Sequence, residues 1–210
     1  MFNTEDVYWM VGEELLRRRG HTFTRELSDA MMGLTPEPTF AVMIQWHGLD
    51  DTWQELLAES EEIFRQLRGH LSPMPGLIEL LDALEAAGIP KAIGSSSSRR
   101  MLDAVLSQFQ MEPRFAFTLA AEDLAHGKPH PEVYLRAAAR LGVRPEEMLV
   151  LEDSQAGCQA GAAAGAFTVA VPGTHSRGQD FSTASLVIES LADPRLYKVL
   201  GLGRPGVQED

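Results

Sequence analysis

Three short segments place side chains suited to phosphate chemistry directly beside apolar stretches. Ser95 to Ser98 follow the stretch PKAIG, and Lys128 lies in the segment HGKPHP. Glu152 and Asp153 follow the stretch LVL. Hydroxyls and free N–H groups at a strand-to-helix turn can bind phosphate, an ammonium can pair with a phosphate oxygen, and carboxylates suit Mg²⁺. Together these groups predict a site for a phosphorylated ligand and a magnesium ion.

Each segment also has a plainer interpretation. Ser97 or Ser98 could cap the following helix, because a side-chain oxygen accepts hydrogen bonds from free N–H groups. Lys128 could be a solvated lysine in a tight turn, and either acid, Glu152 or Asp153, could be a helix cap. The order and spacing of the three segments favour the functional interpretation over the plainer one.

The elements that must position these residues begin after Pro73, where short apolar stretches alternate with helical patterns. The pattern predicts strands over 90–94, 115–119, 148–151, 167–171 and 186–188, and helices over 77–87, 99–109, 131–141 and 155–164. This alternation is typical of an α/β fold, a parallel sheet with helices on both faces. Ligands of such sheets bind beyond the carboxyl ends of the strands, where the three segments lie.

The preceding segment has helical spacing of apolar residues throughout. It predicts helices over 3–19, 24–32, 39–46 and 52–67. We expect the side chain of Asn3 or Thr4 to cap the first helix and Gly20 to end it. The chain should therefore form two domains, a helical domain over residues 1–72 and an α/β domain over residues 73–210.

The order of Ser95, the segment HGKP and the segment LEDS, followed by Gly157 and Gly161, resembles three motifs of the haloacid dehalogenase-like superfamily. The closest resemblance is to its β-phosphoglucomutase-like and sugar phosphatase branch, and it covers essentially the whole chain. It implies a Rossmann-like core and makes residues 1–72 a helical cap domain.

The resemblance also implies a role for each matching residue. Ser95 and Ser96 would bind the phosphoryl group, and Lys128 would hold both the nucleophile and the phosphate. Asp153 would be a ligand of Mg²⁺, with Glu152 supporting it. Ser95 and Lys128 would therefore be the catalytic residues that this sequence supplies.

One further motif of that family, a central strand ending in Asp-x-Asp, has no match in this sequence. Its first aspartate would form an aspartyl-phosphate, and its second would act as acid and base. Because Asn3-Thr4-Glu5 resembles the triplet that follows this motif, we expect both aspartates ahead of Met1 in a longer natural form. The sheet should then be interrupted between the strands ending near Ser95 and Glu152. Its unpaired edges should make the chain unstable or prone to aggregation.

The resemblance implies Mg²⁺-dependent hydrolysis of a small phosphorylated metabolite, most simply a sugar phosphate. Two alternatives stay open at this point. One is a phosphomutase that moves the phosphoryl group within a sugar phosphate. The other is a protein that binds a phosphate ester without catalysing its reaction.

Composition narrows the range of partners. The formal charge of −12 disfavours binding to nucleic acid or anionic lipid, and no apolar run is long enough to cross a membrane. The single cysteine, Cys158, excludes an intrachain disulfide, and we expect it to be buried and inert. We expect a cytoplasmic monomer. His126 and His130 lack the spaced partners of a zinc site, so we interpret them as turn residues.

Overall fold

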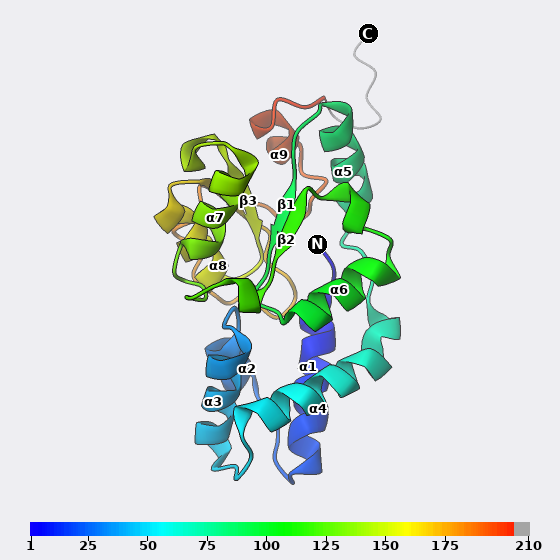
Figure 1. Cartoon of the computed structure of the whole chain (residues 1–210), viewed down its shortest axis with the longest axis vertical. Helices are drawn as coiled ribbons and strands as arrows, with labels where there is room; N and C mark the ends of the chain where they lie inside the picture. The colour runs from blue at the N-terminus through cyan, green and yellow to red at the C-terminus, as the bar shows by residue number, and fades with distance from the viewer. Residues whose placement is uncertain (204–210) are drawn as a thin grey trace.

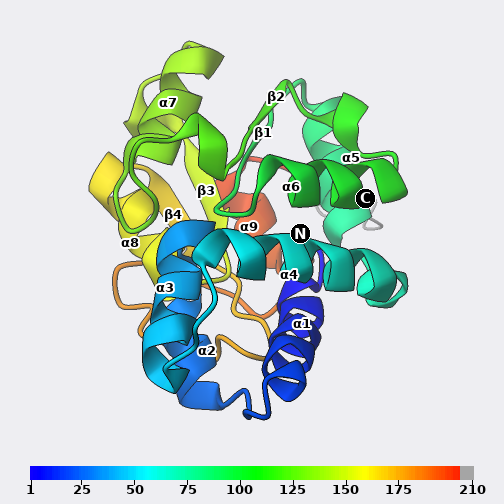
Figure 2. The same ribbon diagram turned by 60° about the horizontal axis from the view of Figure 1, so that its bottom comes forward.

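The computed structural model describes residues 1–203, and residues 204–210 of the predicted second domain lie outside the described part. The helical region comprises the first four α-helices and a short 3₁₀ helix, and it forms the lower half of Figure 1. These elements are α1 (Thr4–Arg18), α2 (Arg25–Met31), α3 (Pro36–His47), α4 (Trp53–Leu67) and η1 (Arg68–His70). α4 packs against α1 and α3, and α2 packs against α3, as Figure 2 shows.

Local capping explains where several of these helices begin. The Thr52 hydroxyl oxygen accepts a hydrogen bond from the backbone N–H of Glu55, and the Glu55 carboxylate accepts one from the backbone N–H of Thr52. These two hydrogen bonds form a capping box at the start of α4. The capping predicted for Asn3 or Thr4 is wrong. Asn3 stands at the N-cap position, but its Oδ1 accepts instead from Ser72 N at 2.6 Å. This hydrogen bond connects the start of α1 to the segment that follows η1.

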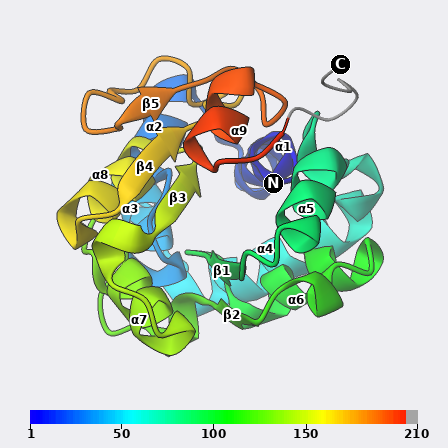
Figure 3. The same ribbon diagram turned by 90° about the horizontal axis from the view of Figure 1, so that it is seen from above.

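The strands form two separate parallel groups. β1 (Ala92–Gly94) pairs with β2 (Phe117–Leu119), and β3 (Leu149–Glu152) pairs with β4 (Phe167–Ala170), which pairs with β5 (Leu186–Val187). Among residues 1–203 no strand joins β1 to β3, and Figure 3 shows the two groups apart. The predicted interruption of the sheet between these strands is confirmed.

Helices cover both faces of the strands, as the sequence predicts. The remaining helices are α5 (Leu77–Ala86), α6 (Arg99–Gln108), η2 (Glu112–Arg114), η3 (Ala121–Asp123), α7 (Glu132–Leu141), η4 (Pro145–Glu147), α8 (Gln155–Ala164) and α9 (Pro194–Val199). α7 and α8 share a buried cluster with Leu119 of β2 and Val150 of β3. A larger cluster joins Val169 of β4 and Ile188 to α5, α6, α9 and the helical region.

The largest differences from the prediction lie at α3 and α9. α3 begins at Pro36, three residues earlier than the predicted helix, because proline is favourable in the first turn of a helix. α9 is absent from the prediction. It begins at Pro194, where Asp193 accepts from Arg195 N at 2.8 Å.

No helix in residues 1–203 has the length and apolar character required to cross a membrane.

Candidate active site

The Lys128 side chain joins the carboxyl ends of β1 and β3. Its ammonium donates to the carbonyl oxygen of Gly94 at 3.3 Å and to Oε1 of Glu152. Lys128 and Glu152 are only 8% and 7% exposed, so the ion pair is largely removed from water. The alternative of a solvated surface lysine is therefore wrong.

Glu152 is held on both of its oxygens. The hydroxyl of Tyr134 donates to Oε1, and the hydroxyl of Ser154 donates to Oε2 at 3.3 Å. Burial beside this carboxylate raises the pKa of Tyr134 well above its ordinary value, so the phenol stays a donor. Neither acid caps the following helix, because Ser154 occupies the N-cap of α8 and accepts from Gly157 N at 3.1 Å.

Asp153, the next residue after β3, has a different environment. In residues 1–203 no donor from another residue is bonded to its carboxylate, although the side chain is not fully exposed. Burial, followed by repulsion from Glu152, raises the pKa of Asp153. The charges of the N-terminal ammonium and of Lys128 offset part of this rise, but neither forms an ion pair with Asp153 among the described residues. A partly buried carboxylate without a close ion pair, at the end of a strand, fits a divalent cation with oxygen ligands.

The four serines after β1 have separate roles. Ser95 Oγ accepts from Ser97 N at 3.0 Å, so its own hydroxyl hydrogen remains for a ligand. Ser96 Oγ instead donates to the carbonyl oxygen of Gly33 at 2.8 Å, and Ser97 Oγ lies 2.7 Å from the Tyr8 hydroxyl. Ser98 caps α6 by accepting from Met101 N. The capping interpretation is confirmed for Ser98, while Ser95 directly follows Gly94, whose carbonyl oxygen accepts from Lys128.

The loop between α2 and α3 lies over these groups. Gly33 of this loop receives the Ser96 hydrogen bond. A Cβ built on Gly33 would be 3.0 Å from Cβ of Ala156, and one on Gly127 would be 2.7 Å from Cγ2 of Thr35. The helical region therefore contacts three segments: residues 95–98 (the serine loop), residues 126–131 around Lys128, and the start of α8.

A third carboxylate, Glu5 at the start of α1, lies close enough to Asp153 for their charges to interact. Its neighbours are Gly173, Ser176 and the backbone of His175, and its Oε1 is buried without a hydrogen-bond partner. Burial, followed by the charge of Asp153, raises the pKa of Glu5 to about 7. Sequence reasoning placed Glu5 in a motif but gave no sign of its surroundings, because its neighbours come from a loop far along the chain.

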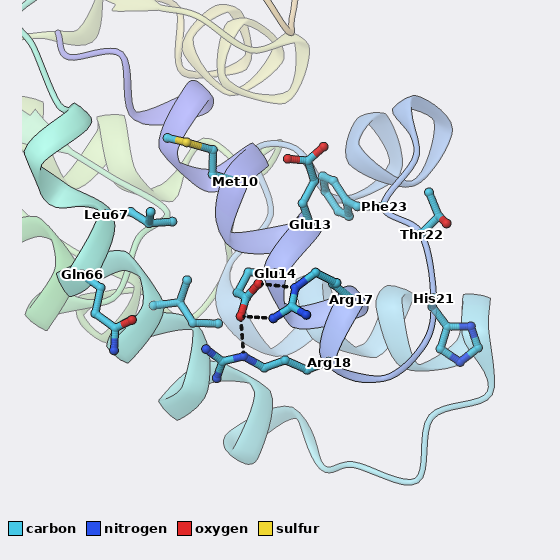
Figure 4. Close-up of a pocket in the computed structure, with 11 residues that line it drawn as sticks. Met10, Glu13, Glu14, Arg17, Arg18, His21, Thr22, Phe23, Gln66 and Leu67 are labelled. Atoms are coloured by element: carbon cyan, nitrogen blue, oxygen red, sulfur yellow. Dashed lines mark hydrogen bonds and ion pairs between the residues drawn. The ribbon is translucent and has the colours of Figure 1, made fainter.

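A hollow of about 580 Å³ opens elsewhere, on the helical region (Figure 4). Residues of α1, α4 and the segment 21–23 line it. Three of the charged groups there pair with one another, since Glu14 accepts from Arg17 at 2.7 Å and from Arg18 at 2.8 Å. None of the predicted site residues lines this hollow.

Comparison with known proteins agrees with this geometry. A family model described as haloacid dehalogenase-like hydrolase matches residues 1–171. The chain is 31% identical to a protein of Drosophila melanogaster described as a probable pseudouridine-5'-phosphatase, and the match covers 92% of this chain and 86% of that protein. It is 30% identical to the bifunctional riboflavin kinase/FMN phosphatase of Arabidopsis thaliana, with 94% of this chain covered. The chain spans 52% of that relative's length.

A solved structure shares the fold. CbbY from Rhodobacter sphaeroides, crystallised in complex with phosphate, superposes with a TM-score of 0.82 at 24% identity. The match covers 92% of this chain and 91% of that one. It shows that the arrangement of helices and strands described above occurs in a known α/β structure.

Proposed function

Because the chain belongs to the haloacid dehalogenase-like hydrolase family, we propose that it takes part in Mg²⁺-dependent hydrolysis of a small phosphorylated metabolite, with sugar phosphates as the substrate class. One observation carries the proposal. The Lys128 ammonium contacts both Gly94 and Glu152, the last residues of β1 and β3. The residues that directly follow them, Ser95 and Asp153, are the proposed ligand groups.

The proposed roles follow from the hydrogen bonds that each group still has to offer. The buried Lys128 ammonium has a third N–H beyond the two that Gly94 and Glu152 receive, and this one donates to a phosphoryl oxygen. Ser95 donates its free hydroxyl hydrogen to a second oxygen. Both donors are fixed before the ligand arrives, so they stabilise negative charge on the phosphoryl group with little reorganisation.

Glu152 is a positioning residue in this proposal. Its oxygens already accept hydrogen bonds from Lys128, Tyr134 and Ser154. It would therefore support the metal site indirectly, by fixing these neighbours, and would not bind the ion itself. Asp153 is the residue that would hold Mg²⁺, and the bound ion would neutralise charge on the phosphoryl oxygens. We also propose that residues 1–72 act as a cap, because the loop between α2 and α3 contacts the serine loop.

The test is release of inorganic phosphate from a panel of sugar phosphates, measured with the protein as its native host makes it. Activity that needs Mg²⁺ and falls at least about 100-fold in Ser95→Ala supports the proposal. Ser107→Ala, at an exposed serine of α6, is the matched control and should retain full activity.

Other outcomes would replace the proposal. Conversion of a sugar 1-phosphate to its 6-phosphate isomer without phosphate release would indicate a phosphomutase. Saturable binding of phosphate esters with no turnover of any of them would indicate a binding protein. Phosphate release that is unchanged in Ser95→Ala would show that the site described here does not carry out the reaction.

A further inference from the structure

A group of three potential metal ligands lies on the outer side of the loop that carries Lys128. One nitrogen each from His126 and His130 and one carboxylate oxygen of Glu132 all lie within 4.8 Å of one another. The two imidazole rings face each other, with centroids 4.5 Å apart and planes inclined by 30°. The sequence pattern singles out only the two histidines, and the fold brings in Glu132 as the third group.

Glu132 is already fixed in place as an anion. Its Oε1 accepts from Ala125 N at 3.1 Å, and its Oε2 accepts from His126 N at 2.8 Å. Arg136 lies 2.8 Å from Oε1, and these contacts, led by the Ala125 N–H, lower the pKa of Glu132 to about 2. The carboxylate is therefore charged at every physiological pH, and its orientation does not depend on an ion.

Each histidine has one long contact with Glu132, His126 with its carboxylate and His130 with its backbone N–H. His126 Nδ1 is 3.2 Å from Oε2 of Glu132, and the Glu132 N–H donates to His130 Nδ1 at 3.3 Å. Both rings are exposed, so they can turn toward a common ion. A tetrahedral Zn²⁺ site needs its nitrogen and oxygen ligands about 3.3 Å apart. The ligand atoms here lie within 4.8 Å of one another, so an ion has to draw the exposed rings closer. Pro129 and Pro131 restrict the backbone between them.

We propose that His126, His130 and Glu132 form a binding site for a transition-metal ion of the Zn²⁺, Co²⁺ or Ni²⁺ type. Two imidazoles and one carboxylate suit these ions, whereas Mg²⁺ prefers oxygen ligands such as Asp153. The three ligands are spread along residues 126–132, on either side of Lys128. A bound ion would cross-link both ends of that loop, and water would fill its remaining coordination position.

The experiment is a titration of the whole protein with Co²⁺ in excess Mg²⁺, followed by visible absorbance, with Zn²⁺ added to displace the Co²⁺. We expect one equivalent of Co²⁺ to bind with the absorbance of a site containing nitrogen ligands. His126→Ala and His130→Ala should each weaken binding at least about tenfold. Thermal unfolding in EDTA checks that each variant folds as the wild type does.

Two controls separate this site from others. The rings of His21 and His47 also lie close together, with centroids 4.6 Å apart, but no carboxylate of the described residues completes a third ligand there. His21→Ala should therefore leave Co²⁺ binding unchanged, and so should Asp153→Asn. Co²⁺ binding that survives in the His126→Ala/His130→Ala double variant, or that is lost in Asp153→Asn, would overturn the proposal.

Discussion

Gly157 and Glu152 occupy adjoining space: a Cβ built on Gly157 would lie 1.9 Å from Oε2 of Glu152. The first turn of α8 thus approaches the buried carboxylate too closely for any side chain. A glycine at this position is a condition for Glu152 to reach Lys128 and Tyr134.

Gly157→Ala should therefore be destabilising. We expect a loss of about 2–3 kcal/mol in the free energy of unfolding, because Glu152 must move and give up its buried partners. Urea unfolding measures it. Gly69→Ala is the matched control, since a Cβ there meets no atom within 4 Å, and equal effects of the two substitutions would contradict the packing described here.

Replacement of the lysine should separate stability from function. Lys128→Met leaves Glu152 buried without its cation, which should cost about 3–5 kcal/mol of stability. The double variant Lys128→Met/Glu152→Gln removes both charges and should recover most of that loss while phosphate release stays absent. Thermal unfolding and the phosphate assay check the two parts. A Lys128→Met protein as stable as the wild type would mean that the ion pair contributes nothing.

The raised pKa of Asp153 leads to a prediction about magnesium. In EDTA, Asp153→Asn should be more stable than the wild type, because it removes a partly buried charge beside Glu152. Millimolar Mg²⁺ should raise the melting temperature of the wild type but not of the variant. Asp103→Asn, on the exposed side of α6, should respond to Mg²⁺ as the wild type does.

Glu5 should make stability depend on pH. Its pKa is raised from 4.5 to about 7 in the folded protein, so between these values the folded state holds a proton that the unfolded state has lost. Stability contributed by this group is therefore present at low pH and declines as pH rises through about 7, by up to roughly 3 kcal/mol.

Glu5→Gln tests that sign. In EDTA at pH 8 we expect the variant to gain about 1–3 kcal/mol over the wild type in urea unfolding, and the gain should largely disappear at pH 5. The exposed Glu13 of α1 offers the control Glu13→Gln, which should show no such difference. A gain at pH 5 that is equal to that at pH 8 would rule out titration as its cause.

Local pattern predicted the parts of the fold that depend on neighbouring residues. The strands before Ser95 and Asp153 were found from apolar stretches that end in polar side chains, and the parallel arrangement followed from the alternation of elements. Thr24 and Thr52, the first residues of two predicted helices, are helix caps in the structure. These features are local because the hydrogen bonds that define them span only a few residues.

Contacts between distant segments were not predictable in the same way. The side chain of Asn3 bonds to Ser72 rather than to its own helix, and Tyr134 reaches Glu152 from α7. Tyr134 looks like an ordinary apolar position on an amphipathic helix, so its hydroxyl gave no signal. The loop of the helical region that contains Gly33 determines which serine hydroxyl is hydrogen-bonded within the protein. Only the fold brings this loop beside the serines.

The hydrogen bond from Ser96 to Gly33 has a consequence for how a ligand enters. A hydroxyl has one hydrogen to give, so Ser96 cannot donate to a phosphate and to the Gly33 carbonyl at once. The Ser96–Gly33 hydrogen bond and donation from the Ser96 hydroxyl to an anion are therefore mutually exclusive. Docking of the α2–α3 loop and anion binding at this serine must weaken each other by the same free energy. The helical region and a ligand therefore compete for the single hydroxyl hydrogen of Ser96.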